Sequence, residues 1–330
     1  MNLTADAPID TNSNQLVFRK LTARIGAEIR GLDLTSVTEE QIKQIRAALN
    51  EHKALVFREA NVHSNEEQVA FASNFGPLTQ AHPTTYSVDG APEVLPVDSE
   101  ISVANTWHTD VTFVVNPPQA STLRSVTLPE YGGETLIAST VGAYDDLPVE
   151  LRSFAESLWA IHSNDYDYVN PKNLEHKNSE EQRKIFTRIK FETAHPVARV
   201  HPLTGKRNLF IGAFAQRLRI LGVSNTESRD LLRLLQAYVT RPENIVRVNC
   251  EPNQVVLFDN RATQHYAQTI TTEKPGHSLA SRSRATFRST STANQATPSK
   301  AIPRPTQWWH RSNLPQALVR RPLAPGQRLR

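Results

Sequence analysis

The sequence of 330 residues contains one cysteine, Cys250, so it can form no internal disulfide and no cysteine-based zinc site. It also lacks any run of about 18 consecutive apolar residues, which a membrane-spanning helix requires. Its first ten residues are polar and carry an acid before any base, unlike a secretory signal. These absences predict a chain that works in a reducing compartment, the cytoplasm, and that has no membrane partner.

Acidic residues are missing from the C-terminal part of the chain. The segment from Gly276 to Arg330 holds ten Lys or Arg and no Asp or Glu, so that the overall net charge of +4 leaves −6 for the first 275 residues. The same segment is rich in Ser, Thr, Arg and Pro and shows no usable periodicity, which predicts disorder. We therefore expect a folded domain over residues 1–275 and a basic tail over residues 276–330.

Hydrophobic periodicity divides the first 275 residues into short strands and a few helices. Helices are predicted at 38–51, 64–75, 143–146, 149–158, 179–190 and 226–238. Strands are predicted at 16–25, 28–33, 54–57, 112–115, 120–128, 135–139, 194–200, 208–212, 245–248 and 254–258. Short strands separated by Pro, Gly and Asn turns predict an α+β fold, with a double-stranded β-helix (jelly-roll) core and flanking helices.

A His-x-Asp pair stands at the start of one predicted strand. His108 and Asp110 are two positions apart, so on an extended strand both side chains would leave from the same face. A second histidine from far along the chain would complete a two-histidine, one-carboxylate triad, which leaves open positions on the metal and suits non-haem Fe(II) oxygenases. Such a pair is common by chance, and the chain has eleven histidines, so the pattern alone leaves the third ligand open.

Several longer motifs carry a family resemblance. They are WHTDVTF at 107–113, GGET at 132–135, two His-Pro pairs that begin at 195 and 201, and FDNRATQHYA at 258–267. In this order they resemble the taurine dioxygenase (TauD/TfdA) family of Fe(II)/2-oxoglutarate-dependent dioxygenases, over a span from about Leu16 to about Gln268. The stretch LWAIHSNDYDY at 158–168 is most similar to the alkylsulfatase branch of that family.

The resemblance implies a set of site residues. His108, Asp110 and His265 match the three iron ligands, which act at the catalytic centre. Thr135 matches the threonine whose hydroxyl helps hold a carboxylate of 2-oxoglutarate.

Substrate-contacting positions follow less directly from the resemblance. The family's asparagine before the tryptophan corresponds to Ala104 here, and Asn105 stands one position further on. For Phe210, packing in the protein core is as good an explanation as a place in the apolar wall of the substrate pocket. The candidate substrate residues are His82, Tyr86, Asn105 and Phe210.

The resemblance also implies the reaction. Fe(II), 2-oxoglutarate and O2 would hydroxylate the carbon next to a sulfate ester or sulfonate, which releases an aldehyde and sulfate or sulfite, with succinate and CO2 as coproducts. The substrate would be a small sulfur-containing anion, and members of the family assemble as homodimers or homotetramers. The alternatives are a dioxygenase for taurine or another small anion, and a metal-binding remnant without turnover. We expect no nucleic-acid partner, because the basic tail lacks a helical stripe or a repeated aromatic–Arg pattern.

The tail departs from the family where two arginines are expected. About eleven and fifteen residues after the distal histidine, the family carries one Arg for 2-oxoglutarate and one for the sulfur oxyanion, but Gly276 and Ala280 stand here. Reading the tail with the third base of each codon plus the first two of the next permits the string RTLTRVTVAGDVPFDVD, which restores both. We therefore hypothesise a frameshift in the coding sequence between about Thr271 and Gly276, and resequencing that shows no insertion or deletion there would refute it.

A genuine tail is the rival interpretation. Arg284 and Arg288 are also four residues apart, so a longer loop could bring Arg284 to 2-oxoglutarate and Arg288 to the substrate. If neither arginine reaches its partner, 2-oxoglutarate loses a charge-assisted pair and should bind several kcal/mol more weakly.

Overall fold

The computed structural model describes residues 15–80, 87–98, 104–128, 132–164, 191–212, 218–268, 281–287 and 297–298. Three candidate site residues lie outside this described part of the chain, namely His82, Tyr86 and Arg288, and so does the helix predicted at 179–190. Within the described part, no helix is both long enough and apolar enough to cross a membrane.

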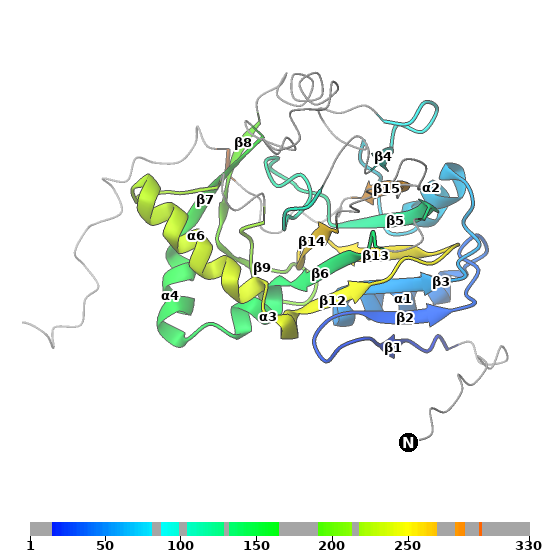
Figure 1. Ribbon diagram of the computed structural model, residues 1–330, viewed down its shortest axis with the longest axis horizontal. Coiled ribbons are helices and arrows are strands. Elements are labelled where there is room, and N and C mark those ends of the chain that lie inside the picture. The colour runs from blue at the N-terminus through cyan, green and yellow to red at the C-terminus, as the bar shows by residue number, and fades with distance from the viewer. Residues whose placement is uncertain are drawn as a thin grey trace, which may run out of the picture.

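A seven-stranded sheet forms one wall of the fold (Figure 1). Its strand order is β1-β2-β3-β13-β5-β15-β4, and its pairs are antiparallel except for β2 with β3. The strands are β1 (Arg19–Lys20), β2 (Ala27–Arg30), β3 (Ala54–Arg58), β4 (Val94–Asp98), β5 (Ala120–Thr127), β13 (Val255–Asp259) and β15 (Ser281–Phe287).

The remaining described strands form three smaller sheets. The sheet β12-β6-β14 lies opposite the large sheet and carries one of the candidate ligands, His265. Its strands are β6 (Thr135–Ser139), β12 (Ile245–Val248) and β14 (Thr263–Ala267). The other two sheets have the orders β11-β7-β8-β16 and β10-β9, and consist of β7 (Trp159–Ser163), β8 (Glu192–Pro196), β9 (Ala198–Val200), β10 (Arg207–Leu209), β11 (Arg219–Ile220) and β16 (Thr297–Pro298).

Strand β3 shows why the large sheet is apolar on both faces. Alternate side chains of a strand point to opposite faces. Ala54 and Val56 pack toward the small sheet with Val246 and Val248 of β12, whereas Leu55 and Phe57 belong to a separate core under the helices. Two faces are buried, so the strand reads as a continuous apolar run instead of an alternating one.

Helices cover the outer faces of this β-sandwich. Helices α1 (Glu39–His52) and α2 (Asn65–Ser73) pack on the large sheet, and each begins with a capping box. Helices α3 (Thr140–Asp145), α4 (Val149–Ser157) and α6 (Asn225–Val239) form a second core with β7, β10 and β11, and the short 3-10 helix η2 (Pro242–Asn244) precedes β12. Figure 1 shows α4 and α6 together at one end of the molecule and α2 at the other. The α+β jelly-roll prediction is confirmed.

One predicted strand is wrong, and its position matters for the site. Residues 112–115 form turns, and Val111 adopts a φ of 51°, in the left-handed region. The β-branched and aromatic side chains here favour a strand, but they are buried without one, because Val111 and Phe113 form a small core of their own. Conversely, β14 carries His265 although the sequence analysis assigned no strand there.

The C-terminal segment also differs from expectation, because it contributes two strands to the sheets. The shorter one is β16, which pairs with β8. Residues Ser281–Phe287 form β15, which pairs with both β4 and β5 inside the large sheet. The prediction of disorder is therefore wrong for these seven residues. Backbone hydrogen bonds to a strand on each side can order a segment that lacks hydrophobic periodicity. The frameshift remains a prediction about the gene.

Candidate metal centre

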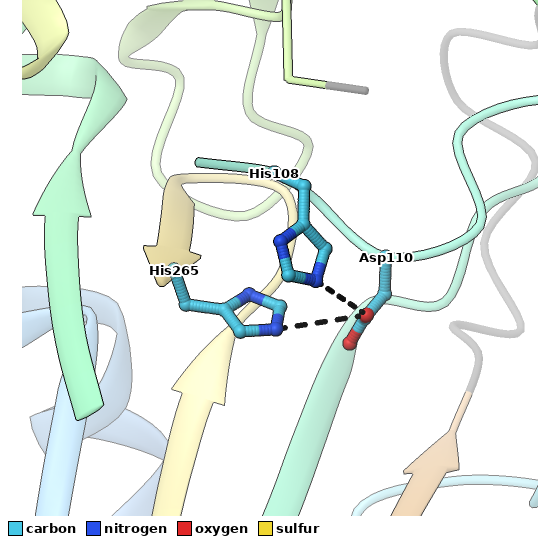
Figure 2. A group of neighbouring side chains, drawn as sticks. All are labelled: His108, Asp110 and His265. Atoms are coloured by element: carbon cyan, nitrogen blue, oxygen red, sulfur yellow. Dashed lines mark ion pairs between the residues drawn. The ribbon is translucent and has the colours of Figure 1, made fainter. Parts of the chain in front are cut away.

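Two imidazoles and one carboxylate converge between the sheets (Figure 2). His108 Nε2 lies 3.8 Å from Asp110 Oδ1, and His265 Nε2 lies 3.7 Å from the same oxygen. One donor atom from each of the three residues lies within 4.8 Å of the other two. The exposed fractions are 1% for His108, 0% for Asp110 and 7% for His265, so the group is shielded from bulk water.

A backbone bridge brings the two histidines together. His108 donates its N–H to the His265 carbonyl over 3.0 Å, and His265 donates back over 2.8 Å. Directly opposed residues of an antiparallel pair project to the same side, so the two rings meet with centroids 4.0 Å apart. The sequence pattern predicted His108 at the start of a strand and no strand around His265, but His265 is on β14 and His108 is in an isolated bridge.

The tautomer of His108 is fixed by a neighbour. Its Nδ1 lies 2.7 Å from the Thr106 carbonyl oxygen. A carbonyl can only accept, so Nδ1 carries the hydrogen and Nε2 presents its lone pair toward Asp110. This is the usual way in which a protein orients a metal-binding imidazole.

The two oxygens of the Asp110 carboxylate have different neighbours. Ser121, on β5, donates its hydroxyl to Oδ2 over 3.0 Å, which leaves Oδ1 facing both histidines. A fully buried carboxylate is costly without a cation beside it. Two neutral imidazole nitrogens and one carboxylate oxygen are donors for a borderline divalent metal, and this set of three fits Fe(II).

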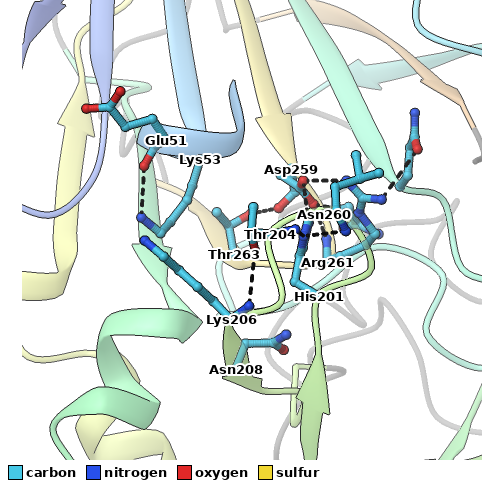
Figure 3. Close-up of polar contacts among 12 residues, drawn as sticks. Glu51, Lys53, His201, Thr204, Lys206, Asn208, Asp259, Asn260, Arg261 and Thr263 are labelled. Carbon is cyan, nitrogen blue, oxygen red and sulfur yellow. Dashed lines mark hydrogen bonds and ion pairs between the residues drawn. The ribbon is translucent and has the colours of Figure 1, made fainter. Parts of the chain in front are cut away.

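A buried ionic cluster supports the turn between β13 and β14 (Figure 3). Asp259 Oδ2 accepts from His201 Nε2 at 2.9 Å and from Arg261 Nη2 at 2.7 Å, and its exposed fraction is 1%. Burial alone would raise the pKa of Asp259, but Arg261 and His201 hold the pKa below its usual range. The ordered turn positions β14 and therefore His265.

Two further histidines are buried beside the site and stay neutral. Burial lowers the pKa of His195 to about 3 and that of His162 well below its ordinary value, and Arg199 adds to both shifts. Their rings stand 4.9 Å apart, and both contact Phe210. Phe210 is 2% exposed, so it lies in this internal aromatic cluster.

The remaining candidates are placed as follows. Thr135 is buried on β6 opposite Ala267, two positions from the residue paired with His265, so Thr135 and His265 are on one face of the small sheet. Asn105 is half-buried three positions before His108. Arg284 lies in β15, and its backbone pairs with that of Leu123 in β5.

Sequence reasoning missed two residues that hold the site. Ser121 binds the carboxylate of Asp110, and Asn260 binds its backbone. The only available signal was the position of Asn260 within the NRATQH motif that ends at His265.

Comparison with known proteins agrees with the fold and the donor set. Residues 18–282 match the family described as "Taurine catabolism dioxygenase TauD, TfdA family". An alkylsulfatase of Acinetobacter baylyi is 48% identical over 262 residues, which covers 78% of this chain and 82% of the relative. An alpha-ketoglutarate-dependent sulfate ester dioxygenase of Pseudomonas putida is 45% identical over 256 residues, which covers 77% of this chain and 84% of the relative.

A solved structure has the same architecture. The crystal structure of a taurine dioxygenase from Burkholderia xenovorans superposes with a TM-score of 0.71 and 35% identity, and the match covers 87% of this chain and 96% of the other. Enzymes of this kind use Fe(II), 2-oxoglutarate and O2, and the donor set described above fits that metal. The chain belongs to the TauD, TfdA family and is an Fe(II)- and 2-oxoglutarate-dependent dioxygenase.

Proposed function

We propose that the enzyme acts on alkyl sulfates, a class of small sulfur-containing anions. The observation that carries this proposal is the identity of 45–48% to two relatives named for sulfate ester cleavage, over more than four-fifths of their lengths. In the proposed reaction, the carbon bearing the sulfate ester is hydroxylated, and the product collapses to an aldehyde and sulfate. One oxygen atom of O2 enters that carbon and the other enters succinate, which forms with CO2 from 2-oxoglutarate.

The three chelating residues have distinct duties in this proposal. His108, Asp110 and His265 would hold iron, which supplies the centre where 2-oxoglutarate and O2 are activated. The Thr106 carbonyl keeps the lone pair of His108 directed inward, and Ser121 keeps one oxygen of Asp110 directed at the histidines. Both contacts limit rotation of the ligands, so the site is preorganised before metal arrives.

Thr135 is proposed to bind a carboxylate of 2-oxoglutarate through its hydroxyl. Its position on the His265 face of the small sheet supports this role. Arg284 is proposed as the cation for the far carboxylate, supported by its strand, which lies next to the β5 strand that carries Ser121. For the substrate, we retain His82, Tyr86, Asn105, Phe210 and Arg288 as proposed contacts.

An activity panel tests the function. The purified full chain, loaded with Fe(II) and supplied with ascorbate and 2-oxoglutarate, is given linear alkyl sulfates of increasing length, the matched alkanesulfonates and taurine. We expect succinate and sulfate in equal amounts from alkyl sulfates, and no product from the matched control His265→Ala. Sulfate release without succinate would contradict an oxidative mechanism.

A sulfonate substrate is the second candidate. A Saccharomyces cerevisiae relative named alpha-ketoglutarate-dependent sulfonate dioxygenase is 30% identical over 285 residues, which covers 82% of this chain and 67% of the relative. Sulfite in place of sulfate from the panel would favour this alternative. Absence of succinate with every substrate would favour the metal-binding remnant.

The cellular compartment and the oligomeric state of the enzyme are also proposals. We propose a cytoplasmic homodimer or homotetramer, supported by the single cysteine and by the family resemblance. Light scattering on the purified chain gives the number of subunits, and a monomer at working concentration would contradict it.

A further inference from the structure

We propose that Asn260 is a positioning residue of the metal centre, which acts by fixing the backbone of Asp110. The inference rests on the iron-dependent function above, and it concerns a residue outside the set of three donor residues. It explains how a carboxylate on a turn can be held as firmly as a histidine on a strand.

Asn260 uses its whole amide group on the ligand segment. Asp110 donates its N–H to Asn260 Oδ1 over 2.8 Å, and Asn260 Nδ2 donates to the Asp110 carbonyl over 3.0 Å. The second Nδ2 hydrogen goes to the Pro118 carbonyl, also over 3.0 Å. An asparagine amide has two N–H donors, so both are spent here.

Asn260 is itself anchored by the surrounding fold. It is 1% exposed, and its backbone N–H donates to the Gln119 carbonyl over 2.9 Å. The preceding residue is Asp259, whose carboxylate is locked by His201 and Arg261. The clamp on Asp110 is therefore anchored in the buried ionic cluster, on the same turn that leads to His265.

The turn after Asp110 needs such a clamp. Val111 has a φ of 51°, and a β-branched residue in the left-handed region is strained unless its surroundings enforce it. On the far side of the turn, His195 Nε2 donates to the Thr112 carbonyl and Thr193 Oγ1 to the Phe113 carbonyl, each over 2.8 Å. Asn260 supplies the hold on the near side, at the residue that carries the ligand oxygen.

A metal titration with a matched control tests the proposal. The full chain, freed of metal, is titrated with Co(II), and the visible absorption bands report affinity and coordination. Asn260→Ala should bind Co(II) about 10–100-fold more weakly, because losing an outer partner of a ligand has that effect. Asn260→Asp should be at least as weak, since an oxygen would then face the two carbonyls that now accept N–H bonds.

Asn244 is the control. It is also fully buried, and its Nδ2 donates to the Tyr238 carbonyl over 3.0 Å while its Oδ1 accepts from Arg24 over 2.9 Å. Asn244→Ala should lower the melting temperature of the metal-free chain. Its Co(II) affinity and its Co(II) spectrum should be the same as those of the parent. A merely structural role for Asn260 would give both variants the same result.

Two outcomes would overturn the proposal. One is parental Co(II) affinity and spectrum in Asn260→Ala. The other needs no variant: in the metal-free parent, hydrogen exchange of the Asp110 amide should be as slow as that of the His265 amide, and fast exchange at Asp110 would show that Asn260 does not hold it. A parent chain that binds no Co(II) at all, with a slow Asp110 amide, would instead overturn the iron-dependent function and leave the clamp in place.

Discussion

Gly212 lies directly against Thr109, the residue between the two ligands His108 and Asp110. The Thr109 N–H donates to the Gly212 carbonyl, and the Thr109 hydroxyl donates to the Thr263 carbonyl over 2.8 Å. A Cβ at position 212 would collide with Thr109 Oγ1 and come within 2.9 Å of Gln264 Cγ. The segment that carries two ligands is thus packed between a glycine and β14.

Substitution of that glycine should damage the metal site. In Gly212→Ala the added methyl must displace Thr109 or Gln264, and overpacking of this kind costs about 1–3 kcal/mol of stability. We expect a lower melting temperature together with weaker Co(II) binding. Gly205→Ala is the matched control, because nothing lies within 4 Å of a Cβ there, although its φ of 69° adds some strain. Equal Co(II) affinity in the two variants would contradict the prediction.

Neutralising the carboxylate should separate metal binding from stability. In Asp110→Asn we expect Co(II) affinity to fall more than about 100-fold, since loss of a ligand exceeds loss of an outer partner. The metal-free variant should melt at the same temperature as the parent or higher, because a buried charge without its cation is removed. Metal titration and thermal unfolding without metal check both parts, and a large drop in melting temperature would show that the carboxylate is structural.

Asp259 should make the free energy of unfolding depend on pH in the acidic range. Its pKa is held below the ordinary value in the folded chain, so its contribution is complete above the unfolded pKa of about 3.9 and declines as the pH falls below that value. In Asp259→Asn we expect a loss of about 3–5 kcal/mol at pH 7, because Arg261 and His201 lose a buried partner. Between pH 5 and pH 3 the variant should lose less stability than the parent.

Denaturant unfolding at several pH values measures this difference. The control is Asp230→Asn, which removes an exposed ion pair with Arg233 and should change stability by less than about 1 kcal/mol. Parallel pH profiles for the parent and Asp259→Asn would show that the buried cluster does not generate the acid dependence.

Truncation should reveal whether β15 stabilises the sheet. Chains that end after residue 287 and after residue 280 both lack β16, and among the described strands they differ only in β15, the neighbour of both β4 and β5. The shorter chain would expose the edge of β5, so we expect a lower melting temperature and aggregation. Equal melting of the two chains would mean that β15 contributes nothing, and would favour the frameshift.

Local chain chemistry determined much of the fold before any tertiary contact was considered. The helix predicted at 38–51 is observed at Glu39–His52, because Thr38 caps it and apolar residues recur at helical spacing. The strand at 54–57 is observed as β3 for the same kind of reason, a compact apolar run. The order of the motifs around His108, Asp110 and His265 was enough for the family, which the comparisons confirm.

Tertiary structure alone decided how the site is held. The run after Asp110 has the composition of a strand, yet burial of Val111 and hydrogen bonds from His195 and Thr193 make it a turn. No pattern in the sequence pairs Asn260 with Asp110, because that contact joins positions 150 residues apart. Sequence periodicity records which face of an element is buried, whereas the partner of a buried polar group depends on which segments the finished fold brings together.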